Sequence, residues 1–196
     1  MYEALYEVKE RCEHCTKCPL HKSKTNTVFS GGVPNSRIML IGEAPGEQED
    51  LQGSPFVGRS GQLLDKILEC VGFSRNENIY ICNTIKCRPP HNRNPLPEEK
   101  AACREYLDSQ IEILKPKIIL LCGAVSVASM IPNNTLGITK IHGKWFDGPH
   151  GAKMMPIYHP AYLLRNASNE VGKPKWQMWQ DIKEVQRLYN EIFGQE

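Results

Sequence analysis

Clustered cysteines are the first residues in this chain whose spacing suggests chemistry. Cys12, Cys15 and Cys18 are three apart, which gives two overlapping C-x2-C pairs, and Cys87 and Cys103 come much later. A C-x2-C turn lets two thiolates face one metal centre, and two thiolates from elsewhere complete four ligands. The wide spacing of the distant pair favours an iron–sulfur cluster, while zinc and thiols unrelated to any metal remain alternatives.

The neighbours of these cysteines favour some of them over others. Pro19 follows Cys18, as at the end of bacterial cluster motifs, which favours Cys15 and Cys18 over Cys12 as ligands. Three further cysteines lie within helix or strand patterns and are expected to pack as small hydrophobic side chains: Cys70, Cys82 and Cys122.

Polar side chains at the ends of apolar segments form a second candidate site. Glu43 follows one such segment, and His159 ends another just before Pro160. Asn83 is polar within a third segment, and its carboxamide, with a donor beside an acceptor, matches one edge of a pyrimidine. The alternative is a solvated loop acid for Glu43, a structural role for His159 and, for Asn83, a side-chain amide bonded to backbone.

The glycine-rich segment 42–61 connects the first apolar segment to a helical pattern. Such loops often hold phosphate on backbone amides, but this one lacks the G-K-S/T of a nucleotide loop, and its acids would repel a triphosphate. We therefore interpret its backbone as the wall of a pocket for a small polar ring. After His159, Leu163 and Leu164 beside Arg165 suit a wedge that enters a DNA stack, although an ordinary hydrophobic anchor is the alternative.

The pattern of apolar residues predicts the elements that position these groups. Runs at 37–41, 79–85, 117–122 and 154–158 predict buried parallel strands, and helical patterns at 63–71, 97–114, 124–131 and 176–192 alternate with them. We expect an α/β fold, a three-layer αβα arrangement with a central, mostly parallel four-stranded sheet. Ligands bind beyond the carboxyl ends of such strands, where Glu43, Asn83 and His159 stand. No linker divides the chain, so we expect one domain over 1–196, with the cysteine turn 12–18 completing the metal site.

Composition limits the class of protein. The chain is 40% hydrophobic and 23% charged, as in soluble globular proteins, and a formal net charge of +2 excludes a strongly basic nucleic-acid binder while leaving room for local patches. The apolar runs are too short to span a membrane, and residues 1–10 lack a secretion signal. We expect a cytoplasmic monomer, in which clustered cysteines ligate a metal rather than form disulfides.

Four ordered motifs resemble one known family. They are G-E-A-P-G-E-Q-E-D at 42–50, P-F-V-G-R-S-G-Q-L-L at 55–64, N-T-I-K-C-R-P-P at 83–90 and H-P-A-Y-L-L-R-N at 159–166. Together with the cysteine spacing, they resemble the family 4 (iron–sulfur) uracil-DNA glycosylases over nearly the whole chain. The resemblance implies an enzyme of base excision repair that flips deoxyuridine out of double- or single-stranded DNA, hydrolyses the N-glycosidic bond and leaves an abasic site.

The resemblance also implies roles for particular residues. Uracil would be held by the backbone around Gly42, Glu43 and Ala44, Phe56 would stack on the base, Asn83 would read its edge, and His159 would contact its O2 atom. Glu43 and His159 would be the catalytic residues. A [4Fe–4S] cluster would be held by four of the cysteines: Cys15, Cys18, Cys87 and Cys103.

A basic surface is expected to hold the DNA phosphates. It would comprise the following side chains together with the loop Leu163 to Arg165: Lys86, Arg88, Lys140, His142 and Lys144. His142 departs from the family, in which many members have arginine at this position. One alternative is therefore a uracil-DNA-binding relative that forms a covalent adduct through His142, and another is a non-catalytic iron–sulfur DNA-binding module.

Overall fold

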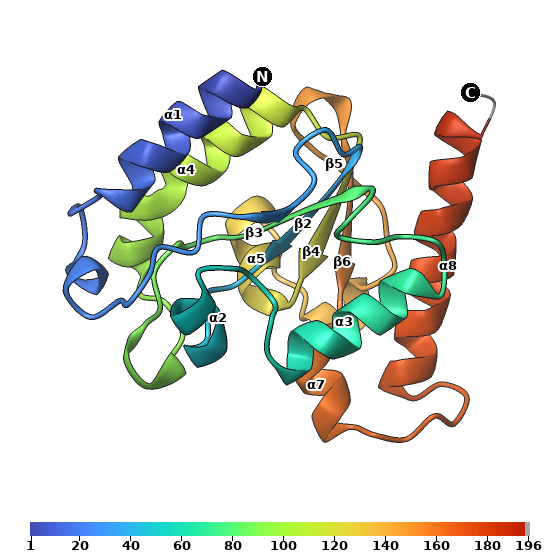
Figure 1. The fold of residues 1–196 in the computed structure, drawn as a ribbon. Coiled ribbons are helices and arrows are strands. Elements are labelled where there is room, and N and C mark those ends of the chain that lie inside the picture. Colours follow the sequence, from blue (N-terminus) through green and yellow to red (C-terminus); the bar gives the residue numbers. More distant parts are fainter. Residues whose placement is uncertain (195–196) are drawn as a thin grey trace.

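The centre of the fold is a sheet of four parallel strands. A computed structural model describes residues 1–194 and contains β2 (Ile38–Gly42), β3 (Ile79–Asn83), β4 (Ile118–Cys122) and β6 (Lys153–Ile157), in the order β3-β2-β4-β6 (Figure 1). These strands confirm the four predicted segments. Two further strands of two residues, β1 (Gly31–Gly32) and β5 (Phe146–Asp147), pair antiparallel at the edges. The sheet therefore has six strands rather than four, because two-residue strands carry no alternation that a sequence pattern could reveal.

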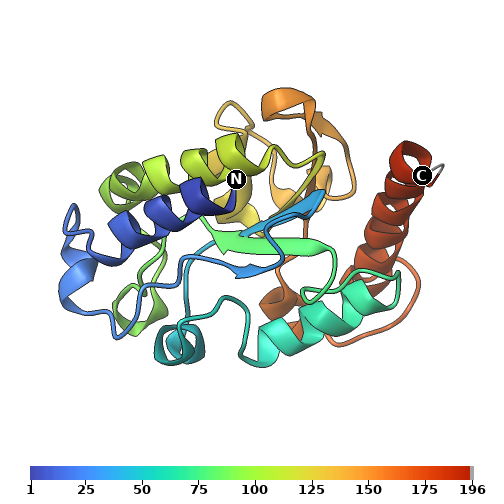
Figure 2. The same ribbon diagram turned by 45° about the horizontal axis from the view of Figure 1, so that its top comes forward.

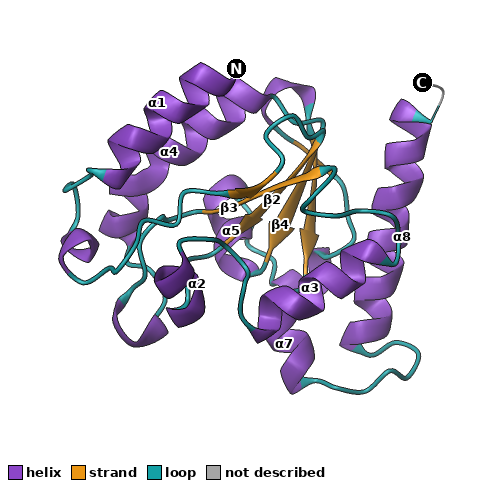
Figure 3. Ribbon diagram, in the orientation of Figure 1, coloured by secondary structure: helices purple, strands orange, loops and turns teal. Residues whose placement is uncertain are grey.

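Helices cover both faces of this sheet, which confirms the three-layer arrangement (Figure 3). One face packs against α1 (Tyr2–Glu13), α4 (Pro97–Leu114) and α5 (Ala124–Met130). The other face packs against α3 (Arg59–Glu69), α7 (Pro160–Arg165) and α8 (Pro174–Phe193). Helix α1 lies alongside α4, as the turned view makes plain (Figure 2).

Alternation along each strand divides the core between these two layers. In β2, Met39 and Ile41 face the α1/α4 layer, while Ile38 and Leu40 face the α3/α8 layer, and none of the four is exposed to solvent. Complete burial of such a side chain contributes about 1.5–3 kcal/mol. Strands that are apolar at every position are thus explained by burial on both sides.

The connections between the strands place one edge of the sheet at the site. Helix α3 carries the chain from β2 outward to β3, and α4 carries it back across β2 to β4 on the opposite face. The strand order therefore reverses between β2 and β4. Ligands bind at such a reversal, beyond the carboxyl ends of the strands, and this is where the candidate residues are found.

Several short helices have no clear sequence signal. They are α2 (Glu47–Gln52) and α6 (Ile138–Ile141), together with three 3-10 turns: Pro19–Lys22, Pro90–Asn92 and Pro149–Gly151. Helix α1 was also unpredicted, because only Leu5, Val8 and Cys12 are buried among charged neighbours. Over residues 1–194, no helix combines the length and apolar character that crossing a bilayer requires.

Candidate active site and cysteine cluster

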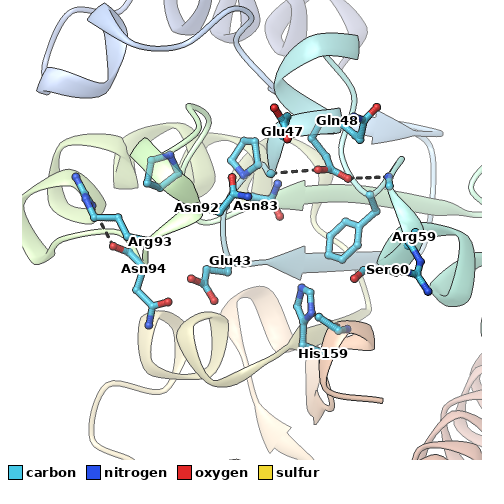
Figure 4. A pocket seen from close by; sticks show the side chains of 18 of the residues that line it. Glu43, Glu47, Gln48, Arg59, Ser60, Asn83, Asn92, Arg93, Asn94 and His159 are labelled. Carbon is cyan, nitrogen blue, oxygen red and sulfur yellow. Dashed lines mark hydrogen bonds between the residues drawn. The ribbon is translucent and has the colours of Figure 1, made fainter. Parts of the chain in front are cut away.

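A cavity of about 720 Å³ opens at the carboxyl ends of the parallel strands. It brings Glu43, Asn83 and His159 together with Phe56 and Ala44. The close-up shows Glu43, Asn83 and His159 around one space (Figure 4). Further residues from α2, α3, α7 and the segment after β3 complete its wall: Glu47, Glu49, Arg59, Ser60, Asn92, Arg93, Asn94, Tyr162 and Arg165. The volume is sufficient for a nucleobase with part of its sugar.

Phe56 enters this cavity on a strained backbone. Its φ of 54° lies in the left-handed region, which a bulky residue adopts only when the surroundings enforce it. Arg75 enforces it by donating from Nη1 to the Pro55 carbonyl oxygen at 2.9 Å and from Nη2 to the Phe56 carbonyl oxygen at 2.8 Å. Asp65 holds the same guanidinium at 2.8 Å. Arg75 is therefore a positioning residue that no motif in the sequence indicated.

Gly42 lies between the two side chains predicted to contact the base. A Cβ atom added there would stand 2.4 Å from Asn83 Oδ1 and 2.6 Å from Cζ of Phe56. Any side chain at position 42 would therefore displace both groups. The glycine allows an aromatic face and an amide edge to approach each other closely enough to flank one flat ring.

Asn83 presents an unpaired oxygen to the cavity. Among the described residues, Asn83 Oδ1 is the buried side-chain polar atom that has no hydrogen-bond partner. Leaving such an atom unpaired costs about 1–3 kcal/mol, so a ligand that donates to it gains this amount. A carboxamide matches the adjacent N–H donor and carbonyl acceptor of uracil, whereas cytosine offers an acceptor and a donor in the opposite order.

His159 is held as a neutral imidazole. Its Nδ1 atom accepts a hydrogen bond from the backbone N–H of Ala161 at 3.1 Å, so the proton of the neutral ring is on Nε2. Burial, assisted by the charge of Arg165, lowers the pKa of His159 to about 4. The ring centroid lies 5.8 Å from that of Phe56. His159 can therefore donate from Nε2 to a ligand oxygen without itself carrying charge.

Glu43 supplies the carboxylate of the cavity. It follows β2 directly, and burial raises its pKa, an effect that Lys100 partly opposes. Glu43 also fixes the next strand, because its backbone carbonyl accepts from Thr84 Oγ1 at 2.6 Å. This bond holds the partly buried Glu43 next to the end of β3, where Asn83 lies.

Glu49 closes the loop that forms one wall. Its Oε1 atom accepts from the backbone N–H groups of Val57 and Gly58, both at 2.9 Å, and its Oε2 atom accepts from Gly46 at 3.1 Å. These bonds join the first motif to the second. The sequence reasoning gave Glu49 no role, although it lies inside the first quoted motif.

Positive charge surrounds the mouth of the cavity. Arg93 is held by two hydrogen bonds, at 2.9 and 2.6 Å, to the buried carboxylate of Glu99, which also caps α4 at Leu96. Arg59 and Arg165 line the same cavity and are exposed. Three guanidinium groups, which bind phosphate well, thus line this cavity.

Two of the predicted DNA contacts are wrong. Lys86 is completely buried, with its Nζ atom donating to Asn83 O at 2.8 Å and Gln110 Oε1 at 2.6 Å, so it cannot reach a phosphate. Leu163 is 1% exposed and packs in the core, whereas Leu164 is 39% exposed. The predicted wedge is therefore reduced to Leu164 and Arg165, because α7 turns Leu163 inward.

His142 lies outside the cavity. Its Nδ1 atom is 2.7 Å from Asp181 Oδ2, and its ring stacks on Tyr158 with centroids 4.5 Å apart. The side chain is mostly buried and is not part of the cavity wall. A covalent adduct through His142 is therefore left without structural support.

The other predicted basic contacts differ in their exposure to solvent. Lys140 and Lys144 are exposed on and just after α6. Arg88 is half-buried, and its guanidinium binds Asn92 Oδ1 at 2.7 Å. Their contact with DNA stays a prediction.

Five cysteines meet at a second, smaller cavity. Cys15 and Cys18 from the turn after α1 line it together with Cys87 after β3, Cys103 on α4 and Cys12 at the end of α1. Burial raises the pKa of Cys87 to about 12 and that of Cys103 to about 11. The raised pKa values favour the protonated thiols. A bound metal centre would favour the thiolates instead, because its positive charge stabilises them.

The donor set of this second cavity fits an iron–sulfur cluster. It gathers thiols from three separate elements, and the four predicted ligands are among them. Within residues 1–194, no three His, Cys, Asp or Glu side chains are grouped so that they could hold a single metal ion. Cys82 and Cys122 are buried as expected, but Cys70 is exposed at the end of α3, so its assignment to the core is wrong.

Comparison with known proteins gives one consistent result. Residues 29–183 match the model of the uracil DNA glycosylase superfamily. A type-4 uracil-DNA glycosylase of Thermotoga maritima is 48% identical over 171 residues, which cover 87% of this chain and 88% of that protein. Type-4 uracil-DNA glycosylases of Sulfurisphaera tokodaii and Archaeoglobus fulgidus are 43% and 40% identical, over 84% and 83% of this chain and 77% and 84% of their own lengths. The chain therefore belongs to the uracil-DNA glycosylase superfamily, within the group formed by its type-4 members.

Proposed function

We propose that this protein is a uracil-DNA glycosylase that hydrolyses the N-glycosidic bond of deoxyuridine in DNA and leaves an abasic site. The observation that carries the proposal is the cavity lined by Phe56 and by Asn83 with its unpaired oxygen, where the absence of a side chain at Gly42 leaves room for both groups. A flat ring with an N–H donor fills that space. A base reaches it only after leaving the duplex stack, which costs a few kcal/mol.

The chemistry assigned to the two catalytic residues follows from their charges. The C1′–N1 bond breaks with its electron pair moving to uracil, whose negative charge collects on O2, and His159 donates from Nε2 to that oxygen. The sugar becomes cationic, and the Glu43 carboxylate stabilises it and orients a water molecule. Water adds to C1′ and gives up a proton, while the uracil anion takes one, so free uracil and an abasic sugar result.

The pH dependence of this reaction follows from the two pKa shifts. Glu43 must be ionised, and burial raises its pKa, so activity is expected to fall on acidification at a higher pH than an ordinary glutamate would give, as the carboxylate takes up a proton. His159 stays neutral through this range because its pKa is lowered to about 4. The acid limb of the rate profile is therefore expected to move when Glu43 is replaced, and not when His159 is replaced.

We further propose that Cys15, Cys18, Cys87 and Cys103 hold a [4Fe–4S] cluster. Such a group stabilises the fold by joining the turn after α1 to β3 and α4. The partner is proposed to be uracil-containing DNA, double- or single-stranded, with Leu164 and Arg165 at the base stack and the exposed basic residues at the phosphates. One domain over 1–196, acting as a cytoplasmic monomer, remains the expectation.

The test is release of free uracil from synthetic oligonucleotides. Iron-replete protein is incubated with strands that carry one uracil opposite guanine, opposite adenine or unpaired, and abasic sites are cleaved by alkali and counted. We expect cleavage at uracil and none at thymine in a matched strand. Glu43→Gln is expected to reduce the rate by roughly 10²–10⁴-fold, the range for a positioned catalytic group. Absence of release by folded, brown protein would refute the proposal.

A further inference from the structure

Lys86 is a buried cation that has no role in the proposed reaction. It follows β3 in the third motif, and it is 0% exposed. Its Nζ atom donates to two neutral oxygens, Asn83 O and Gln110 Oε1, and lies 5.8 Å from the ring of Phe29. Within residues 1–194, no carboxylate forms an ion pair with it. An unpaired buried charge is costly, and proteins normally place an opposite charge beside it.

The cysteines are the groups near Lys86 that can supply the opposite charge. Lys86 lines the smaller cavity together with the predicted ligands and directly precedes Cys87. Its backbone N–H donates a hydrogen bond to the sulfur of Cys103, and its positive charge acts on both Cys103 and Cys12. Four thiolates around an iron–sulfur core carry net negative charge, which the buried ammonium would balance.

The same ammonium also fixes the base-reading residue. The oxygen that it binds at 2.8 Å is the backbone carbonyl of Asn83, whose side chain flanks the larger cavity. Gln110, the second acceptor, is anchored by its own donation to Tyr80 Oη at 2.8 Å and Phe29 O at 3.1 Å. Lys86 is therefore held on rigid elements and contacts residues of both sites. Its side chain binds the Asn83 carbonyl, and its backbone N–H binds the sulfur of Cys103.

We propose that Lys86 is the internal counter-charge of the cluster and, through the Asn83 carbonyl, a positioning residue for uracil recognition. Only the positioning role in uracil recognition rests on the proposed function. It explains why a lysine occupies a place where a hydrophobic residue would otherwise pack. It also predicts that the cysteine site and the base pocket are both altered when the charge of Lys86 and its hydrogen bonds are removed. When the charge alone is neutralised, only the cysteine site is expected to change.

Two variants of the full-length protein separate these effects. Lys86→Met removes the charge and both hydrogen bonds at nearly the same volume. Gln110→Glu places a carboxylate against Nζ, which neutralises the charge but keeps Lys86 bonded to Asn83. Lys117→Met, at an exposed lysine before β4 and at the opposite end of the sheet, is the matched control.

Three measurements are made on each purified variant: the reduction potential of the cluster, the rate of iron loss to a chelator, and the Kd for a duplex that carries uncleavable 2′-fluoro-deoxyuridine. Lys86→Met is expected to make the potential more negative, to speed iron loss by roughly tenfold, and to raise Kd by roughly tenfold. Gln110→Glu is expected to shift the potential in the same direction while Kd stays within about twofold. Lys117→Met is expected to change none of the three.

Specific results would overturn the inference. A wild-type potential in either variant contradicts the counter-charge, and so does a colourless protein that holds zinc. A raised Kd in Gln110→Glu equal to that of Lys86→Met contradicts positioning through Asn83. If Lys86→Met does not fold, Gln110→Glu decides alone: a wild-type potential overturns the counter-charge, and a Kd raised by roughly tenfold overturns positioning through Asn83. The potential and the iron loss require no base release, so a wild-type protein that holds its cluster but releases no uracil would refute the proposed function and not the counter-charge.

Discussion

Replacement of Gly42 by alanine is the sharpest test of the base pocket. The added Cβ would lie 2.4 Å from Asn83 Oδ1 and 2.6 and 2.7 Å from two ring atoms of Phe56, whereas ordinary contacts begin at 3.4 Å. Both side chains must therefore withdraw by roughly 1 Å, and a misplacement of about 1 Å costs about 10²-fold in rate. We expect kcat/KM for uracil release to fall about 10²-fold, which corresponds to about 2.7 kcal/mol.

The fold itself is expected to survive this change. Gly42 ends β2 without a positive φ, so alanine meets no backbone strain there. Gly137→Ala is the matched control, because its added Cβ would meet only Thr139 Oγ1 at 3.9 Å. Single-turnover uracil release and thermal unfolding are measured on both variants. If Gly42→Ala releases uracil within about threefold of the wild-type rate, Asn83 and Phe56 do not flank the reacting base and the reasoning fails.

Three further predictions test other parts of the structure. Because His159 has a folded pKa of about 4, below its unfolded value of 6.5, its contribution to the free energy of unfolding is complete above pH 6.5 and is lost as pH falls to 4. That contribution is about 3 kcal/mol. In urea unfolding, the free energy of unfolding should fall less between pH 7 and pH 4 for His159→Ala than for the wild type, and an equal fall in both proteins would contradict the reasoning. Cys87→Ser is expected to abolish brown colour and lower Tm by about 10 °C, read by absorbance and calorimetry, and retained colour would remove Cys87 from the ligands. Leu164→Ala is expected to slow release from duplex more than from single strands at unchanged Tm, while Leu163→Ala lowers stability by about 2–5 kcal/mol; a uniform effect of Leu164→Ala on both substrates would argue against the wedge.

The central sheet was predictable because burial on both faces leaves a strong local signal. The segments around Ile38, Ile79 and Ile118 are apolar except for Asn83, and each became a strand buried on both sides. Strands β1 and β5 were not predictable, because a two-residue strand is defined by its partner rather than by its own sequence.

Burial of single side chains was decided by the tertiary structure. The sequence shows Lys86 beside Arg88 and gives no reason to separate them, yet one is completely buried and the other reaches the surface. The same holds for Leu163 and Leu164, whose neighbouring positions on α7 face the core and the solvent. Which face of a short helix packs inward depends on the layer beneath it, and that layer comes from distant segments.

The sequence by itself determined which residue types are available for chemistry and at which strand ends they stand. Glu43, Asn83 and His159 could be chosen as candidates because parallel strands place their carboxyl ends on one edge. Only the tertiary structure decided that Arg75 strains Phe56 into the cavity and that Asn83 keeps an unpaired oxygen. These features depend on atoms brought together across tens of residues, so no local pattern encodes them.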